Sequence, residues 1–179
     1  MATRKFLIVV DMQNDFIDGA LGTGEAVAIV PAAAERIRAC RSAGDTLIAT
    51  QDTHGEDYMQ TQEGRHLPVP HCIRGTAGWQ LRPEIAQALG EEAVRVEKPA
   101  FGSVRLPELV AEMLAPGETP EFELLGLCTD ICVVSNALIL KARFPEAPMR
   151  IHADCCAGVT PAKHEAALET MRSCQVEVL

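Results

Sequence analysis

Short apolar runs alternate with longer segments of helical period along this chain. Apolar runs of about four to eight residues indicate buried strands, whereas apolar residues three or four positions apart indicate helices packed along one face. Strands are predicted at 5–10, 45–50, 93–97, 121–127, 149–153 and 175–178. Helices are predicted at 26–43, 80–89, 105–114, 131–143 and 161–173. This alternation predicts a three-layer α/β/α fold, in which a doubly wound, six-stranded parallel sheet carries helices on both faces.

Two features modify this pattern. Pro31 lies within the first predicted helix and is expected to bend or restart it. Residues 51–79 have no sustained period and contain four glycines, two prolines and three histidines. A connection of this length is either functional or disordered, so we treat it as a candidate binding loop. No linker divides the 179 residues, and we expect a single domain over 1–179.

Composition and charge limit the classes of partner that this protein is expected to bind. The formal net charge is −9, and Lys and Arg are scattered, which argues against a nucleic-acid-binding surface. The first apolar run ends at an acid after five residues, so neither a signal peptide nor a membrane segment is expected. Seven cysteines in such a chain indicate reduced thiols and a cytoplasmic protein.

Several reactive side chains follow the predicted strands directly. Asp11 follows the first strand, Asp52 and His54 follow the second, and Lys98 follows the third. Residues 129–132 follow the fourth strand and open a helix. Ligands of an open parallel sheet bind beyond the carboxyl ends of its strands. All of these residues are therefore expected at one edge of the sheet.

Cys132 is the candidate nucleophile at this edge. A free thiol has a pKa near ~8.5, so a catalytic cysteine needs a cation, a helix N-terminus or a base beside it. The first turn of a helix would give Cys132 free backbone N–H groups, Lys98 would supply the cation, and Asp11 would accept the proton. Each residue also has a structural alternative. Cys132 could be a buried helix cysteine, Asp11 could cap a helix or a turn, and Lys98 could be a solvated lysine. Gln13 and Asn14 either orient Asp11 or shape its turn, and we assign neither to catalysis.

A second group of side chains has the chemistry of metal ligands. Asp52 and His54 are two residues apart, and His71 lies in the same long loop. Carboxylate oxygen and neutral imidazole both suit zinc, iron or manganese. The alternative is a set of solvated loop histidines, and the spacing alone leaves both open.

Three blocks of this sequence resemble a known family. The segments IVVDMQNDF, VEKPAFGS and LLGLCTDICV are similar to the three signature blocks of the isochorismatase-like cysteine hydrolases, and the likeness spans essentially the whole chain. The resemblance implies a catalytic triad of Asp11, Lys98 and Cys132. It also implies an oxyanion hole formed by the backbone N–H groups of Cys128 and Cys132, with a cis peptide at Leu127–Cys128.

Within this family, the loop residues are most similar to the metal site of nicotinamidases. That resemblance implies Asp52, His54 and His71 as ligands of a divalent transition metal, with zinc preferred and iron or manganese as alternatives. It implies Glu63 as a fourth ligand, with His66 as a less favoured substitute. Positions on the metal would remain open for the pyridine nitrogen of a substrate and for water.

The aromatic lining of the pocket departs from the nicotinamidase pattern. The segment LPVPHC lacks the ring that several nicotinamidases place before the last histidine. The short segment directly after Lys98 offers only Phe101 as an aromatic wall, and Phe16 is our candidate for packing against a substrate ring. Tyr58 and Trp79 could replace the missing ring.

The resemblance therefore implies a cysteine-dependent amidohydrolase, with nicotinamide as the preferred substrate, acting through a thioester. A metal-independent hydrolase of a carbamoyl amine or vinyl ether is the alternative within the family, and a non-enzymatic thiol redox or binding protein is the alternative outside it. We expect a small amide as partner, and self-association into a homo-oligomer.

Overall fold

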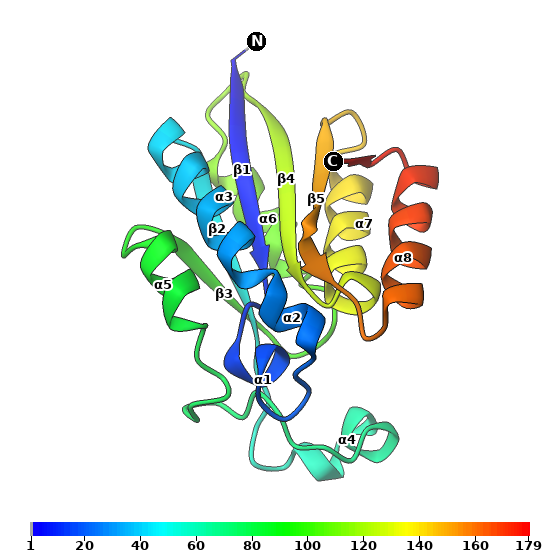
Figure 1. The fold of residues 1–179 in the computed structure, drawn as a ribbon. Helices are drawn as coiled ribbons and strands as arrows, with labels where there is room; N and C mark the ends of the chain where they lie inside the picture. The colour runs from blue at the N-terminus through cyan, green and yellow to red at the C-terminus, as the bar shows by residue number, and fades with distance from the viewer. Residues whose placement is uncertain (1) are drawn as a thin grey trace.

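The protein forms a single parallel β-sheet flanked by helices (Figure 1). A computed structural model describes residues 2–179. The six strands lie in the order β3-β2-β1-β4-β5-β6, and every neighbouring pair is parallel. The strands are β1 (Thr3–Val10), β2 (Thr46–Asp52), β3 (Val94–Lys98), β4 (Thr119–Leu127), β5 (Met149–Ala157) and β6 (Glu177–Val178). The predicted six-stranded, doubly wound α/β fold is confirmed.

The helices cover both faces of this sheet. They are α1 (Asn14–Ile17), α2 (Gly24–Ala28), α3 (Val30–Ala43), α4 (Gln62–His66), α5 (Pro83–Leu89), α6 (Arg105–Met113), α7 (Val134–Arg143) and α8 (Pro161–Ser173). Helix α3 packs against α5 on one side, and α7 packs against both α6 and α8 on the other. A 3₁₀ helix at Tyr58–Gln60 and a π-helical turn at Thr129–Val133 complete the set.

The boundaries differ from prediction where local chemistry interrupts a pattern. The predicted helix 26–43 is two helices, because the chain restarts at α3 with Pro31 in its first turn. The predicted helix 80–89 begins only at Pro83, which occupies its first turn. Strand β5 extends to Ala157, so that the adjacent Cys155 and Cys156 lie within the strand. Their polar neighbour Asp154 hides this extension in the hydrophobic pattern.

The core forms around the central strand β1, whose residues Phe6 to Val10 are all buried. Strand β1 pairs with β2 on one side and with β4 on the other, so that the direction of winding changes beside it. The carboxyl ends of these strands are where a doubly wound sheet opens a crevice. The segment between β2 and α5, which includes α4, lies at this end of the sheet (Figure 1). Among residues 2–179, no helix is long and apolar enough to cross a membrane.

The two central strands approach closely at Gly126. This residue pairs with Val10 and has a φ of 128°. An added Cβ would lie 2.1 Å from the carbonyl oxygen of Val10. Only glycine therefore allows β4 to lie at this distance from β1 immediately before the Cys128–Cys132 turn.

Replacing Gly126 by alanine should therefore destabilise the protein by roughly 2–6 kcal/mol, because backbone strain and overpacking add together. Gly117→Ala is the matched control, since Gly117 has a φ of 83° but no atom within 4 Å of an added Cβ. That control should cost only about 1–2 kcal/mol. Urea unfolding of both variants measures the difference, and equal losses would show that the contact with Val10 is unimportant.

Candidate active site

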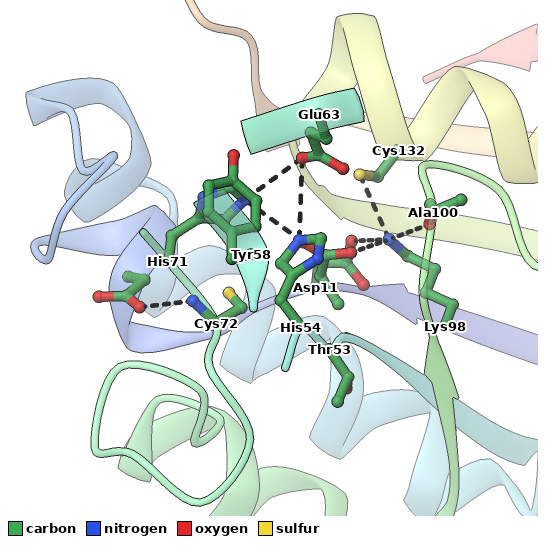
Figure 2. A network of polar contacts seen from close by, with 12 residues as sticks. Asp11, Thr53, His54, Tyr58, Glu63, His71, Cys72, Lys98, Ala100 and Cys132 are labelled. Carbon is green, nitrogen blue, oxygen red and sulfur yellow. Dashed lines mark hydrogen bonds and ion pairs between the residues drawn. The ribbon is translucent and has the colours of Figure 1, made fainter. Parts of the chain in front are cut away.

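Asp11, Lys98 and Cys132 come together at the carboxyl end of the sheet (Figure 2). Nζ of Lys98 lies 2.6 Å from Oδ2 of Asp11 and 3.4 Å from Sγ of Cys132. Lys98 is the last residue of β3, Asp11 follows β1, and Cys132 lies in the π-helical turn after β4. All three side chains are buried. Three segments that are distant in sequence thus place an acid, a cation and a thiol within direct contact.

The backbone and Thr50 fix the orientation of Asp11. Asp11 has a positive φ of 47°, and its N–H donates to the carbonyl oxygen of Thr50 on β2. Oγ1 of Thr50 donates to Oδ1 of the Asp11 carboxylate at 2.6 Å. The other oxygen, Oδ2, forms the ion pair with Lys98 but accepts no aligned hydrogen bond among residues 2–179. That oxygen therefore keeps a lone pair for a proton from the neighbouring thiol.

The three groups control one another's protonation. Burial raises the pKa of Asp11, and the Lys98 ammonium opposes that rise. Burial would lower the pKa of Lys98, but the charges around it, led by Asp11, hold that pKa above its usual range. The pKa of the Cys132 thiol is raised by burial first and by Asp11 second, with Lys98 opposing. These shifts favour a neutral thiol beside an ammonium group.

The local features of the Cys132 turn and the burial of its thiol act on the pKa in opposite directions. The sequence places Cys132 in the first turn of a helix beside a cation, and both features favour thiolate. In the structure, burial and the Asp11 carboxylate together outweigh these effects. A nucleophilic Cys132 would therefore need a proton acceptor, and Asp11 is the carboxylate beside it.

The turn that carries Cys132 is closed on a single carbonyl group. The N–H groups of Ile131 and Val133 both donate to the carbonyl oxygen of Cys128. The Leu127–Cys128 peptide is cis, as the family resemblance implies. Oδ1 of Asp130 accepts a hydrogen bond from the N–H of Val159, which ties this turn to the chain before α8.

A four-residue group of possible metal ligands adjoins the triad. Asp52, His54, Glu63 and His71 each offer one ligand atom, and these atoms all lie within 4.8 Å of one another. Nε2 of His54 is 2.9 Å from Oδ2 of Asp52, and Nε2 of His71 is 3.6 Å from the same oxygen. The structure therefore brings together the ligand set expected from the sequence, with Glu63 as its fourth member.

The surroundings of this group fit a divalent cation. Nδ1 of His71 is hydrogen-bonded to the carbonyl oxygen of Val69 at 2.8 Å, so Nε2 faces the other ligands as an acceptor. The carboxylates of Asp11, Asp52 and Glu63 face one ammonium group, that of Lys98. Among these groups the carboxylates outnumber the ammonium group by two, an excess of negative charge that a divalent metal would offset.

His66 lies outside this group. Its Nδ1 is hydrogen-bonded to the carbonyl oxygen of Gln62 within α4, and its side chain lines the pocket beyond the ligands. Glu63, three residues earlier, points toward His54 and His71 (Figure 2). The substitution of His66 for Glu63 as a ligand, which the sequence left open, is therefore wrong for this structure.

Lys98 joins the two halves of the site. Its Nζ lies 3.2 Å from Oδ1 of Asp52, while Oδ2 of the same carboxylate faces the histidines. Burial would raise the pKa of Asp52, but hydrogen bonds with His54 and His71 and the charge of Lys98 hold that pKa below its usual range. The carboxylate of Asp52 thus stays ionised between the ammonium group and the metal ligands.

Gln13 is a buried residue that the sequence did not assign to the site. Its Nε2 donates to the carbonyl oxygens of Asp52 and Trp79, and its Oε1 accepts from the N–H of Asp52 at 2.7 Å. Gln13 therefore fixes the end of β2, while the neighbouring Asn14 donates to the carbonyl oxygen of Ala77 and shapes the turn. The signal available in the sequence was a polar pair, Gln13 and Asn14, that begins two residues after Asp11.

Aromatic side chains contact the two histidines of the possible metal site. The ring centroid of Phe16 lies 5.6 Å from that of His71. Tyr58 is buried, with its ring 4.8 Å from that of His54, and its hydroxyl donates to the carbonyl oxygen of Leu67. Nε1 of Trp79 donates to Oγ1 of Thr53. Tyr58 and Phe16 therefore both pack on imidazoles.

A pocket of about 750 Å³ opens beside the metal group and the Cys132 turn. Two possible metal ligands, His54 and Glu63, line one side of this pocket. Apolar side chains line much of the rest, namely Leu67, Pro99, Phe101 and Ile131. Such a pocket, with a few polar groups on an apolar wall, suits a small organic molecule.

Comparison with known proteins places this arrangement in context. The family model described as Isochorismatase domain matches residues 5–179. The nicotinamidase of Escherichia coli (strain K12) is 30% identical over 181 residues, which cover 86% of this chain and 83% of that protein. The nicotinamidase/pyrazinamidase of Mycobacterium tuberculosis is 30% identical over 186 residues, 97% of each chain. The crystal structure of a pyrazinamidase of Pyrococcus horikoshii in complex with zinc has a TM-score of 0.83 and 28% identity, covering 98% of each chain.

Metal analysis tests the four-residue group without reference to activity. His71→Ala removes a buried ligand, so purified protein dialysed against zinc and then against buffer should lose most of its bound metal. His66→Ala is the matched control, because His66 is a histidine of the same segment that lies outside the group. It should keep the metal content of the wild type. Equal metal content in both variants would contradict the assignment.

Proposed function

This chain belongs to the isochorismatase family, and on that premise we propose that it is a nicotinamidase, which converts nicotinamide and water to nicotinate and ammonia. The observation that carries the proposal is the ligand group Asp52, His54, Glu63 and His71 beside a buried acid, cation and thiol. The relatives in bacteria that are named nicotinamidase support an amidohydrolase that cleaves C–N bonds.

The proposed chemistry begins with the thiol. Asp11 accepts the proton of Cys132 through Oδ2, and the sulfur attacks the carboxamide carbon. The backbone N–H groups of Cys128 and Cys132 stabilise the oxyanion of the tetrahedral intermediate. Asp11 returns the proton to the departing nitrogen, which leaves as ammonia, and a thioester remains on Cys132. Asp11 then removes a proton from water, which hydrolyses the thioester to the carboxylate and restores the thiol.

Lys98 keeps its proton throughout this sequence. Its raised pKa, its contact with Asp11 and its contact with Asp52 all favour the ammonium form. The positive charge stabilises the thiolate as it forms, and the hydrogen bond to the carbonyl oxygen of Ala100 fixes where that charge lies.

The metal would be zinc, with iron or manganese as alternatives, held by Asp52, His54, His71 and Glu63. When bound, it supplies a Lewis acid that coordinates a heteroaromatic nitrogen or water. Phe16 is proposed to pack near the substrate ring, since it contacts His71 at the inner end of the site. The pocket wall at Phe101 would contact the ring from the outside.

Ammonia release from a small amide panel tests the proposed reaction. Wild type should release ammonia from nicotinamide, and Cys132→Ala should release none above background because the nucleophile is lost. Asp11→Asn should lower kcat by roughly 10²–10⁴-fold, since the proton acceptor is lost.

The same panel separates the alternatives. Nicotinamide left intact while a carbamoyl amine is cleaved by wild type alone would overturn the substrate but not the chemistry. Ammonia release from nicotinamide that persists in Cys132→Ala would overturn the nucleophile.

The pH dependence of kcat/KM tests the role of Asp11. Because burial raises the pKa of Asp11, activity should fall with decreasing pH at a value above that of an ordinary aspartate. The hydrogen bond from Thr50 lowers this pKa, so Thr50→Val should move the acid limb to higher pH by about one unit.

Thr53→Val is the control for this shift, because Oγ1 of Thr53 is bonded to Gln51 and Trp79 and not to Asp11. Its acid limb should coincide with that of wild type when metal is kept in excess. A shift of equal size in both variants, or in neither, would rule out Asp11 as the group that sets the limb.

A further inference from the structure

The loop between β3 and α6 supplies several parts of the site. Lys98 ends β3, and its ammonium group donates to the carbonyl oxygen of Ala100 in this loop at 3.0 Å. Two other residues of this loop, Pro99 and Phe101, form part of the pocket wall. The position of this loop relative to α7 therefore affects where Lys98 lies relative to Cys132.

The side chain of Asn136 joins this loop to the nucleophile. Asn136 lies in α7, four residues after Cys132, and is fully buried. Its Nδ2 donates to the carbonyl oxygen of Cys132 at 2.8 Å and lies 3.3 Å from the carbonyl oxygen of Phe101. Its Oδ1 accepts from the N–H of Ser103 at 2.9 Å. One carboxamide thus bonds the backbone of Cys132 and both ends of the Phe101–Ser103 segment.

The loop is pressed closely against α7 at the same place. An added Cβ at Gly102 would lie 2.5 Å from Cδ1 of Ile139 and 3.3 Å from Cβ of Ser135. The backbone at Gly102 therefore contacts the surface of α7 without a side chain between them. This close contact leaves the loop little freedom to shift while Asn136 binds Phe101 and Ser103, the residues on either side of Gly102.

We propose that Asn136 is a positioning residue, which sets the contact between Lys98 and Cys132 by binding the Phe101–Ser103 segment to the carbonyl group of Cys132. The inference rests on the proposed function, because it takes Cys132 as the nucleophile. Lys98 is tied to the loop through Ala100, and Cys132 is tied to the same loop through Asn136. The positions of the Lys98 ammonium group and the Cys132 sulfur therefore depend on the same loop.

Loss of this carboxamide should reduce the reactivity of the thiol. In Asn136→Leu, the N–H of Ser103 and the carbonyl oxygens of Cys132 and Phe101 lose a partner in the protein interior, and the loop can move away from α7. Asn136→Asp has nearly the same shape and retains the acceptor for Ser103, but its carboxylate no longer donates to Cys132. A displacement near 1 Å between reacting groups can lower a rate by about 10²-fold.

The test compares these variants with a matched change in the same helix. Leu140→Ala removes a fully buried side chain one turn beyond Asn136, so it lowers stability without altering the hydrogen bonds of the loop. For each protein we would measure the melting temperature, kcat and KM for nicotinamide, and the rate at which iodoacetamide alkylates Cys132. Fragmentation of the alkylated peptide in a mass spectrometer separates Cys132 from Cys128, four residues earlier, and the peptide mass separates it from the other five cysteines.

Asn136→Leu and Asn136→Asp should lower kcat and the alkylation rate together by about tenfold or more, with KM changed less. Leu140→Ala should keep both rates within about twofold of wild type at a temperature where it is folded. If Asn136→Leu does not fold, Asn136→Asp carries the comparison alone.

Three outcomes would overturn the proposal. The first is an alkylation rate in the Asn136 variants close to that of wild type, and the second is an equal loss in Leu140→Ala. The third is a change confined to KM, which would mean that only the pocket wall depends on Asn136. The alkylation rate needs no substrate, so wild type that releases no ammonia from nicotinamide would refute the proposed function and leave this comparison intact.

Discussion

A buried ammonium group is the interaction on which the site depends. Lys98 contacts the carboxylates of Asp11 and Asp52 and the sulfur of Cys132, with no part of its charge in contact with bulk solvent. A buried cation is tolerated only when anions and hydrogen-bond acceptors surround it, and removing one such partner typically costs 3–5 kcal/mol. The sheet must therefore bring the ends of β1, β2 and β3 to the same point, and the strand order β3-β2-β1 does so.

The same cation connects two kinds of chemistry. In the proposed mechanism Asp11 accepts the proton of Cys132, whereas Asp52 belongs to the group of possible metal ligands, and Lys98 contacts both carboxylates. A divalent metal would offset the excess of carboxylates over the ammonium group. The metal group and the thiol thus belong to one electrostatic unit, and this unit distinguishes a metal-containing amidohydrolase from a chain with a cysteine in a similar fold.

Periodicity and strand-end position predicted the fold and the grouping of Asp11, Lys98 and Cys132, because parallel strands end at one edge and each of these residues adjoins a strong apolar run. The possible metal ligands lie mostly in a segment without periodicity, so their convergence was expected from the family resemblance. Spacing did not separate Glu63 from His66.

Some side chains of the site bind partners that are 33 to 66 residues away in sequence, namely Gln13, Thr50 and Asn136. No local pattern reveals such pairs. The pKa of Cys132 is raised by burial, which depends on segments distant in sequence, and no local pattern reveals that burial.

Mass spectrometry of protein quenched with acid during turnover of nicotinamide tests the central claim most directly. We expect the peptide that carries Cys132 to gain the mass of one pyridine-3-carbonyl group, and to lose it again when the substrate is exhausted. Ammonia release with no adduct on any cysteine, or with the adduct on a cysteine other than Cys132, would contradict a thioester at this residue.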